Sequence, residues 1–384
     1  MPYAFVPFVL SPTLLLLIYC SSLMNIKYKK IFTFATLFLF ILMLSIVAYG
    51  ITPPSDYYVD FDRIKGEIDL IQTEGINSLK EIYSTSPLSV YLLYSGYLLG
   101  DINVIKFISS FIMYSCLFYI AFKEWESNKY SSITFLVSIL YILSTVNLPG
   151  LVLGVRQGPA LSLAALGAYV GLSENKRLLG FLTIIISSLL HISCILVIIA
   201  FLISVIKNRR IQHVLEILIF AYTIISFYIA SIFSNNDFFG SMLSKMNSYY
   251  IFGDNYDLFT TPFNQIFSII IILSLSTLFL ICKNLYITKN DYYIFYFVIL
   301  LFCIGSLATS TPLRRYTLLA QLAAIPYINI ITQQFIDCRS DNDIIELNRR
   351  KKNMLYIATI FVLLIIAAFS LLNLKQGIIF YINI

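Results

Sequence analysis

Two elements of this sequence place cations at the start of apolar segments. Arg156 and Gln157 are followed by Gly-Pro, and proline is common at the first positions of a helix. A helix N-terminus carries a partial positive charge and unpaired N–H groups, which attract anions. Arg314 and Arg315 precede a second apolar segment, and guanidinium groups suit bidentate contact with phosphate. These residues predict a phosphate site; the competing interpretation is that they reach lipid headgroups at the membrane boundary.

The helix that Arg156 opens is expected to pack closely against a neighbour. Its small residues recur at helical spacing, with Gly167 and Gly171 forming a G-x-x-x-G pair. Such a face allows the backbones of two membrane helices to approach each other.

His191 is the one histidine of this chain in an apolar segment. The other, His213, lies beside Arg209 and Arg210 and reads as a loop residue. A histidine in an apolar segment is often a satisfied core residue. Its ordinary pKa of about 6.5 also allows it to act as a neutral general base or, once protonated, as the electrostatic partner of an anion.

An acidic and aromatic patch is expected in the polar stretch 50–85. Asp56, Tyr57 and Asp60 form it, and the arrangement suits sugar hydroxyls as well as it suits a solvated loop. The stretch fails as a calcium loop because Phe61 occupies the position of the required glycine, and an isolated D-x-D is a weak signal. We therefore expect no metal site and no cofactor.

A second polar stretch, 235–262, is rich in aromatic residues that include Tyr249 and Tyr250. Rings above a sugar-binding groove and rings of a membrane-interface belt look alike in sequence. Both interpretations stay open for this stretch.

The composition predicts a membrane protein. Of its 384 residues, 59% are hydrophobic and 12% are charged, whereas a soluble domain has about 25% charged residues. We expect an all-α, polytopic integral membrane protein, a single transmembrane domain over 1–384 with about 11–12 transmembrane helices, some of them short or re-entrant. The readable apolar spans are 3–23, 31–49, 103–122, 130–148, 157–173, 214–234, 263–283, 291–308, 316–333 and 354–373.

Clusters of basic residues orient these spans, so the net charge of +6 requires no nucleic acid. Positive charge at 27–30, 176–177 and 207–210 is expected in the cytoplasm. The stretch 178–206 must then enter the membrane and return as two short helices, with His191 near their turn. By the same argument, residues 86–100 form a re-entrant or interface-lying helix.

This map gathers the candidate residues on the extracytoplasmic side, together with the stretches 50–85 and 235–262. The combination resembles the EpsG-like and Wzy-type bacterial polysaccharide polymerases, which are GT-C-like membrane glycosyltransferases. The resemblance covers roughly residues 30–335 and rests on four elements in order: Asp56-Tyr57, Arg156-Gln157, His191-Ile192-Ser193, and Arg314 or Arg315. One departure is that "VAYGITPP" lacks the arginine that many relatives carry before the Asp-Tyr element.

The resemblance implies a metal-independent polymerase in the bacterial inner membrane, with its active site on the extracytoplasmic side. It would join undecaprenyl-pyrophosphate-linked repeat units, as donor and acceptor, into O-antigen, capsule or exopolysaccharide, and a chain-length regulator protein is a further partner that it allows. The pyrophosphate would be bound by Arg156, Gln157, Arg314 and Arg315. Either His191 or Asp56 would act as base, and we favour the electrostatic role for His191.

Three other functions use similar residues. A flippase for lipid-linked sugars also needs cations, but along a path through both leaflets. An O-antigen ligase shares the donor and uses lipid A as acceptor. A membrane acyltransferase also has a histidine in a span, but its usual paired signature on the cytoplasmic side is missing from this sequence.

Overall fold

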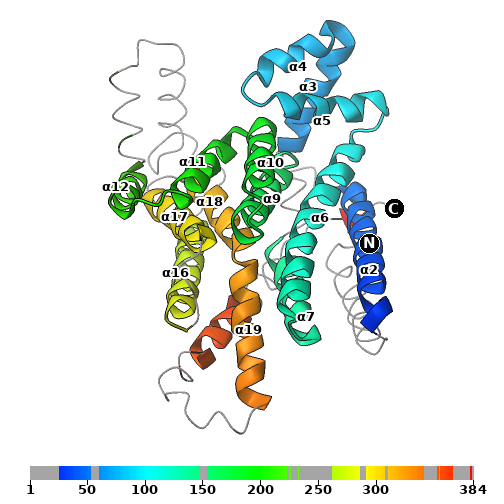
Figure 1. Ribbon diagram of the computed structural model, residues 1–384. Helices are drawn as coiled ribbons and strands as arrows, with labels where there is room; N and C mark the ends of the chain where they lie inside the picture. The colour runs from blue at the N-terminus through cyan, green and yellow to red at the C-terminus, as the bar shows by residue number, and fades with distance from the viewer. Residues whose placement is uncertain are drawn as a thin grey trace.

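The computed structural model describes residues 26–52, 60–146, 154–222, 225, 232, 262–285, 291–307, 310–340, 353, 355–365 and 381–382. These residues are almost entirely helical, which confirms the expected all-α class and leaves the expected number of transmembrane helices a prediction (Figure 1). The expected span 3–23 and nearly all of the stretch 235–262 lie outside the described residues.

The labelled helices are, in chain order, α2 (Ile26–Gly50), α3 (Asp60–Glu74), α4 (Ile76–Ile82), α5 (Pro87–Leu98), α6 (Asn103–Asn128), α7 (Ser132–Thr145), α9 (Gln157–Ala168), its π-helical continuation η1 (Tyr169–Ser173), α10 (Arg177–Leu190), the 3-10 turn η2 (Ile192–Cys194), α11 (Ile195–Ser204), α12 (Arg209–Phe220), α16 (Pro262–Leu285), α17 (Asp291–Gly305), α18 (Ser310–Ala323) and α19 (Ile325–Ser340). One short antiparallel pair is also present among the described residues, in which β1 (Ile51–Thr52) lies beside β2 (Tyr381–Ile382).

Several described helices coincide with the expected spans. Within the described residues, Lys30–Gly50 and Asn103–Asn128 are long and apolar enough to cross a membrane by themselves. The shorter apolar helices are Ser132–Thr145, Arg177–Leu190, Ile192–Ser204, Ser268–Cys282, Asp291–Gly305 and Leu355–Ile365. The expected span 157–173 matches α9 and η1 together, which form one uninterrupted helical stretch.

Two expectations need correction. The single span expected at 316–333 is broken at Ala324, between α18 and α19. Pro326 is the second residue of α19, where its lack of an N–H suits a helix start better than a helix interior. The expected span 214–234 begins earlier, because α12 starts at Arg209 with Asn208 as its N-cap and ends at Phe220.

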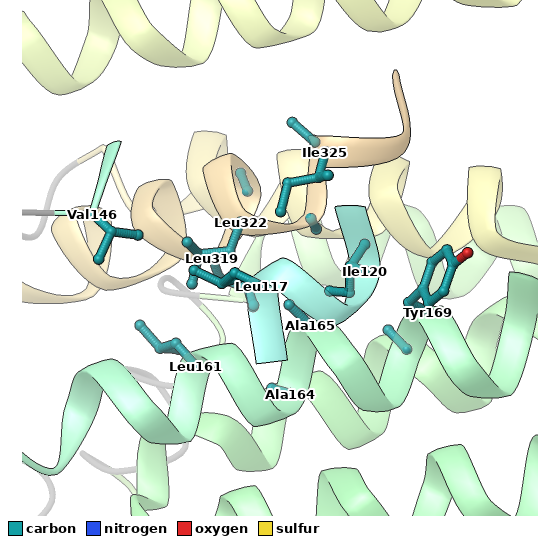
Figure 2. Packing of buried hydrophobic residues seen from close by; sticks show 14 of the residues in the cluster. Leu117, Ile120, Val146, Leu161, Ala164, Ala165, Tyr169, Leu319, Leu322 and Ile325 are labelled. Atoms are coloured by element: carbon teal, nitrogen blue, oxygen red, sulfur yellow. The ribbon is translucent and has the colours of Figure 1, made fainter. Parts of the chain in front are cut away.

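The core is formed around α9, which lies between α6 and α18. Figure 2 shows Leu117 and Ile120 of α6, Leu161 and Ala165 of α9, and Leu319 of α18 packed together. All five side chains are fully buried. The apolar runs that mark these segments in the sequence thus face one another in the folded chain, and α9 is held from two sides.

Glycines bring α9 and α10 into backbone contact, as the small-residue face predicts. A Cβ on Gly180 of α10 would lie 2.4 Å from the carbonyl oxygen of Gly167 and 2.4 Å from the Cα of Gly171. A Cβ on Gly167 would in turn meet Ile184. Because Gly171 pairs with Gly180 while Gly167 pairs with Ile184, the two helices run antiparallel. The start of α9 therefore lies level with the end of α10.

The stretch 178–206 folds back on itself, as its flanking charges predict. Helix α10 ends at Leu190, and after His191 the chain continues in η2 and α11. The Phe201 ring near the end of α11 lies 5.8 Å from the Phe181 ring near the start of α10, centroid to centroid. The two helices consequently form a hairpin with His191 at its turn.

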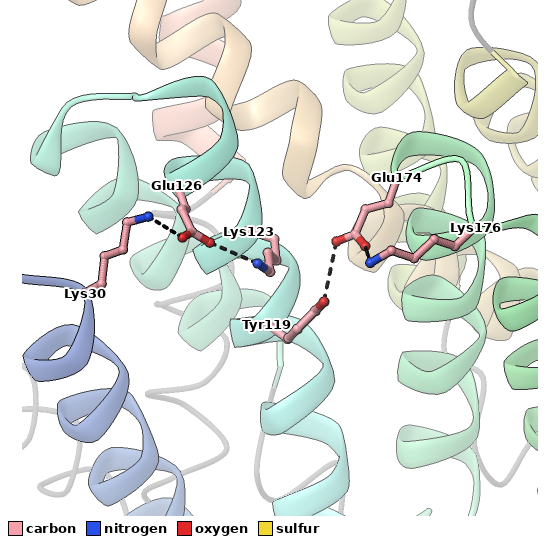
Figure 3. Close-up of polar contacts among 6 residues, drawn as sticks. All are labelled: Lys30, Tyr119, Lys123, Glu126, Glu174 and Lys176. Atoms are coloured by element: carbon pink, nitrogen blue, oxygen red, sulfur yellow. Dashed lines mark hydrogen bonds and ion pairs between the residues drawn. The ribbon is translucent and has the colours of Figure 1, made fainter.

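Polar contacts mark one end of this bundle. Figure 3 shows Glu126 of α6 bound to Lys30 of α2 and to Lys123. In the same region, Tyr119 of α6 lies 3.5 Å from Glu174, which pairs with Lys176 after the end of η1. Lys30 and Lys176, from two of the basic clusters expected in the cytoplasm, thus lie at the end of α9 opposite to Arg156.

The other end of the bundle carries α3, α4 and α5 (Figure 1). The stretch 50–85, expected as a polar loop, contains the helices α3 and α4. Helix α5 spans about 18 Å at 1.5 Å per residue, too short to cross a hydrocarbon core of about 30 Å. Ser89 of α5 donates a hydrogen bond of 2.5 Å to the carbonyl oxygen of Leu190, so α5 is fixed beside the hairpin turn.

Candidate active site

Arg156 lies directly at the N-terminus of α9, as the sequence predicts. It is the N-cap residue, and its carbonyl oxygen accepts a hydrogen bond from the Ala160 N–H at 3.3 Å. Pro159 occupies the first turn, where a missing N–H costs nothing. The side chains of Arg156 and Gln157 are both half-buried. The guanidinium is thus held at the positive end of a tightly packed helix, where anions are favoured.

The Arg156 guanidinium rests on an aromatic ring from the outer helices. Its Cζ lies 4.3 Å from the centroid of the Tyr83 ring, a cation–π distance. The Tyr83 hydroxyl donates a hydrogen bond to Glu67 of α3, whose other carboxylate oxygen binds Arg63 at 2.9 Å. Arg156 is therefore positioned by residues of the stretch 50–85, in a contact that the sequence did not predict.

Tyr83 is held as a neutral hydroxyl. Burial raises the pKa of this hydroxyl above its ordinary value, and the bond to Glu67 acts in the same direction, against the charge on Arg156. A ring that stays uncharged contacts a cation through its π face and leaves the positive charge of the arginine available to a ligand.

His191 occupies the turn between α10 and η2. Its backbone is extended, and its Nδ1 accepts a hydrogen bond from the backbone N–H of Ser193 at 3.2 Å. The Ser193 hydroxyl also lies 2.8 Å from Nδ1. The imidazole is therefore the N-cap of η2, which explains why the His-x-Ser spacing suits this turn.

Two arginines act on His191 from other helices. The guanidinium groups of Arg315 and Arg156 both lie close enough to the half-buried His191 imidazole to interact with it electrostatically. Arg315 comes from α18 and Arg156 from the start of α9. Three residues that are distant in sequence are thus close enough to interact electrostatically at one end of the bundle.

The structure separates the two adjacent arginines of α18. Neighbouring residues of an α-helix point about 100° apart, since a turn takes about 3.6 residues. The Arg314 side chain keeps exposed surface although much of the protein surrounds its guanidinium. Arg315 is half-buried and is the one that acts on His191. The Nε atom of Arg315 is buried and has no hydrogen-bond partner in the described part of the chain. A buried donor without a partner is costly unless a ligand satisfies it.

The remaining predicted site residues are not brought into this cluster by the described structure. Asp56, Tyr57, Tyr249 and Tyr250 lie outside the described residues. Asp60 is described only as the first residue of α3. Among the described residues, no group of three or more His, Cys, Asp or Glu side chains forms a metal-binding arrangement.

Sequence reasoning missed Tyr83 and its support. Nothing around this tyrosine differs from the many other aromatic residues of the chain. The spacing of Arg63 and Glu67 could have indicated a helix in this stretch, because opposite charges four residues apart pair on one helix face.

A comparison with protein-family models matches residues 55–383 to the family described as the EpsG family. The comparisons with curated proteins and with solved structures give no match.

Proposed function

Because this chain belongs to the EpsG family of polysaccharide polymerases, we propose that it polymerises oligosaccharide repeat units carried on undecaprenyl pyrophosphate. The family and the apolar helices indicate a membrane protein. We place it in the bacterial inner membrane, with the site of Arg156 on the extracytoplasmic side. The product would be a surface polysaccharide.

One observation carries this proposal: the guanidinium groups of Arg156 and Arg315 both lie close enough to His191 to interact with its imidazole electrostatically. Like charges repel, so two guanidinium groups near one imidazole are favoured when an anion lies among them. The buried Nε atom of Arg315 also has no hydrogen-bond partner in the described part of the chain. The arginine cluster is therefore the proposed site for a diphosphate ligand.

In the proposed reaction, a hydroxyl of the acceptor's terminal sugar attacks the anomeric carbon of the donor's first sugar. The new carbon–oxygen bond forms as the bond between that carbon and the pyrophosphate breaks. The hydroxyl proton passes to a base, and the lipid pyrophosphate leaves with the bonding electrons. Because negative charge grows on the leaving group, cations fixed beforehand at that position lower the barrier.

Arg156 and Arg315 are the proposed partners of the leaving pyrophosphate. The N–H groups at the start of α9, including that of Gln157, add donors on the same side. Asp56 is the proposed base, as a residue of the Asp-Tyr element. In this proposal the arginines take the place of a divalent ion.

The flippase alternative needs cationic groups along a path through the membrane. Within the described residues, the arginine cluster lies at one end of α9, and the acid-paired lysines lie at the other. This distribution favours an enzyme with one anion site. A ligase would use the same site with a different acceptor.

Deletion of the gene in the source bacterium tests the proposal, with the length of the surface glycan as the readout. We expect long chains to disappear while single repeat units still reach the surface acceptor. Loss of every repeat unit, including single ones, would contradict a polymerase and favour a flippase or a ligase.

A further inference from the structure

We propose that His191 acts as a neutral hydrogen-bond donor through Nε2, aimed at a phosphate oxygen, and that the backbone N–H of Ser193 fixes it in this form. The inference rests on the proposed function for the identity of the ligand. It concerns which ring nitrogen carries the proton, and so replaces both roles considered from the sequence, the general base and the protonated imidazolium.

The backbone N–H of Ser193 is a donor that cannot act as an acceptor. A backbone N–H can only donate, so the contact of 3.2 Å between Ser193 N and His191 Nδ1 requires a lone pair on Nδ1. A neutral imidazole has one protonated nitrogen, and with Nδ1 unprotonated that nitrogen is Nε2. The Ser193 hydroxyl, 2.8 Å from Nδ1, is then a second donor to the same atom.

The same contact disfavours the two other roles. A general base needs an unprotonated Nε2, which would place the proton on Nδ1, facing the Ser193 N–H. An imidazolium carries a proton on both nitrogens and meets the same clash, in addition to the repulsion from Arg315 and Arg156. Either role would require His191 to give up its position as the cap of η2.

Nε2 is the free end of this arrangement. No hydrogen bond to Nε2 is made within the described part of the chain. A neutral N–H beside two cations adds a donor to the site without adding a third like charge. A phosphate oxygen bound by the arginines is the acceptor that this donor fits.

Nitrogen-15 NMR of the full-length protein in lipid tests the tautomer directly. The chain has two histidines, so the His213→Gln variant, labelled with 15N-histidine and purified without a histidine tag, reports on His191 alone. His213 is exposed and pairs with Glu216 at 2.9 Å, away from the hairpin turn. We expect an unprotonated Nδ1 and a protonated Nε2 at pH 7. A protonated Nδ1, in either a neutral or a charged ring, would overturn the inference.

Inorganic pyrophosphate serves as the probe for the acceptor. At saturating pyrophosphate, we expect the Nε2 resonance to shift and Nδ1 to stay unprotonated. A Nε2 resonance that pyrophosphate leaves unmoved would overturn its role as a phosphate donor. Neither spectrum depends on polymerisation, so these outcomes are separate from those of the deletion experiment.

Two amide variants give a matched test in the cell. The glutamine amide nitrogen can occupy the place of Nε2, whereas the shorter asparagine amide reaches only the place of Nδ1. We expect His191→Gln to keep polymerisation within about tenfold of the native protein, since its amide N–H retains part of the hydrogen bond to the phosphate. We expect His191→Asn to lose long chains. Equal loss in both variants at equal membrane abundance would support a base and contradict the donor role.

Discussion

The Arg156 guanidinium lies 4.3 Å from the centroid of the Tyr83 ring, and this contact joins the start of α9 to the outer helices. Tyr83 follows α4 and is itself held by Glu67 of α3. The outer helices are consequently connected to the proposed anion site. A shift of α3 or α4 on substrate binding would therefore change the position of the Arg156 side chain.

This contact predicts that the ring of Tyr83 matters more than its hydroxyl. Tyr83→Phe keeps the aromatic face under Arg156, whereas Tyr83→Leu removes it. A partly buried cation–π contact is worth about 1–2 kcal/mol, so we expect the leucine variant to be about five- to thirtyfold less active and the phenylalanine variant to stay near native activity. Glycan length, normalised to the amount of protein in the membrane, is the measurement. A similar loss of activity in both variants would show that activity depends on the hydrogen bond from the Tyr83 hydroxyl to Glu67 and not on the aromatic face.

The sequence contained enough information for the helices and for the hairpin. The residues 157–173 begin with a Gly-Pro start signal and carry small residues at helical spacing, and the structure has a continuous helical stretch there. The hairpin at His191 followed from basic residues at both ends of 178–206, because charge placement constrains where a segment can end. Both inferences depend on local sequence features.

The other features of the site depend on contacts between segments that are distant in sequence. Such contacts cannot be predicted from local patterns in a single sequence. The pairing of Arg156 with Tyr83 links residues from two separate helices, and the chain has 28 tyrosines from which to choose. The choice between Arg314 and Arg315 depends on the rotation of α18 about its axis. The break at Ala324 was in principle readable from Pro326, but the apolar run around it reads as one span.

The rotation of α18 predicts different consequences for its two arginines. Arg315→Lys keeps the charge but loses the planar fork, and it affects the side chain that acts on His191. We expect a loss of more than tenfold in polymerisation for this variant and less than threefold for Arg314→Lys, since each 1.4 kcal/mol corresponds to about tenfold in rate. The readout is again chain length at matched protein abundance. A more severe defect in Arg314→Lys would reverse the assignment.

The glycine contact between α9 and α10 predicts a stability defect that is separate from chemistry. In Gly180→Ala the added carbon would meet the Gly167 carbonyl oxygen at 2.4 Å. Overpacking of this kind costs about 1–3 kcal/mol, so we expect a lower melting temperature in detergent and lower membrane abundance.

Gly66→Ala is the matched control for that variant. Gly66 lies in α3, and a Cβ there would meet nothing within 4 Å. Alanine in place of glycine in a helix interior favours folding by about 1 kcal/mol. We expect this variant to melt at or above the native temperature, and equal melting temperatures for the two variants would contradict the close packing of α9 on α10.

The topology predicts which side of the membrane each end of the bundle faces. After the native cysteines are replaced, Glu74→Cys and Lys207→Cys place single thiols on two exposed residues. We expect an impermeant thiol reagent added to intact cells or spheroplasts to label position 74 and not position 207. The wider expectation is that 55–80 and 240–258 are extracytoplasmic and that 124–128, 207–212 and 339–351 are cytoplasmic. Labelling of position 207 from outside would contradict the proposed side for the arginine site.

We propose that Arg156 binds the pyrophosphate of the donor, and the Arg156→Lys variant tests this proposal. Its control is Arg177→Lys, the same substitution at an exposed arginine that pairs with Asp291 at 2.7 Å, at the far end of α10 from His191. The measurement is the length distribution of the surface glycan in cells with equal amounts of each variant in the membrane. The account predicts that long chains vanish in Arg156→Lys and persist in Arg177→Lys. Glycan of native length in Arg156→Lys would contradict it, because the arginine would then be only an anchor at the membrane boundary.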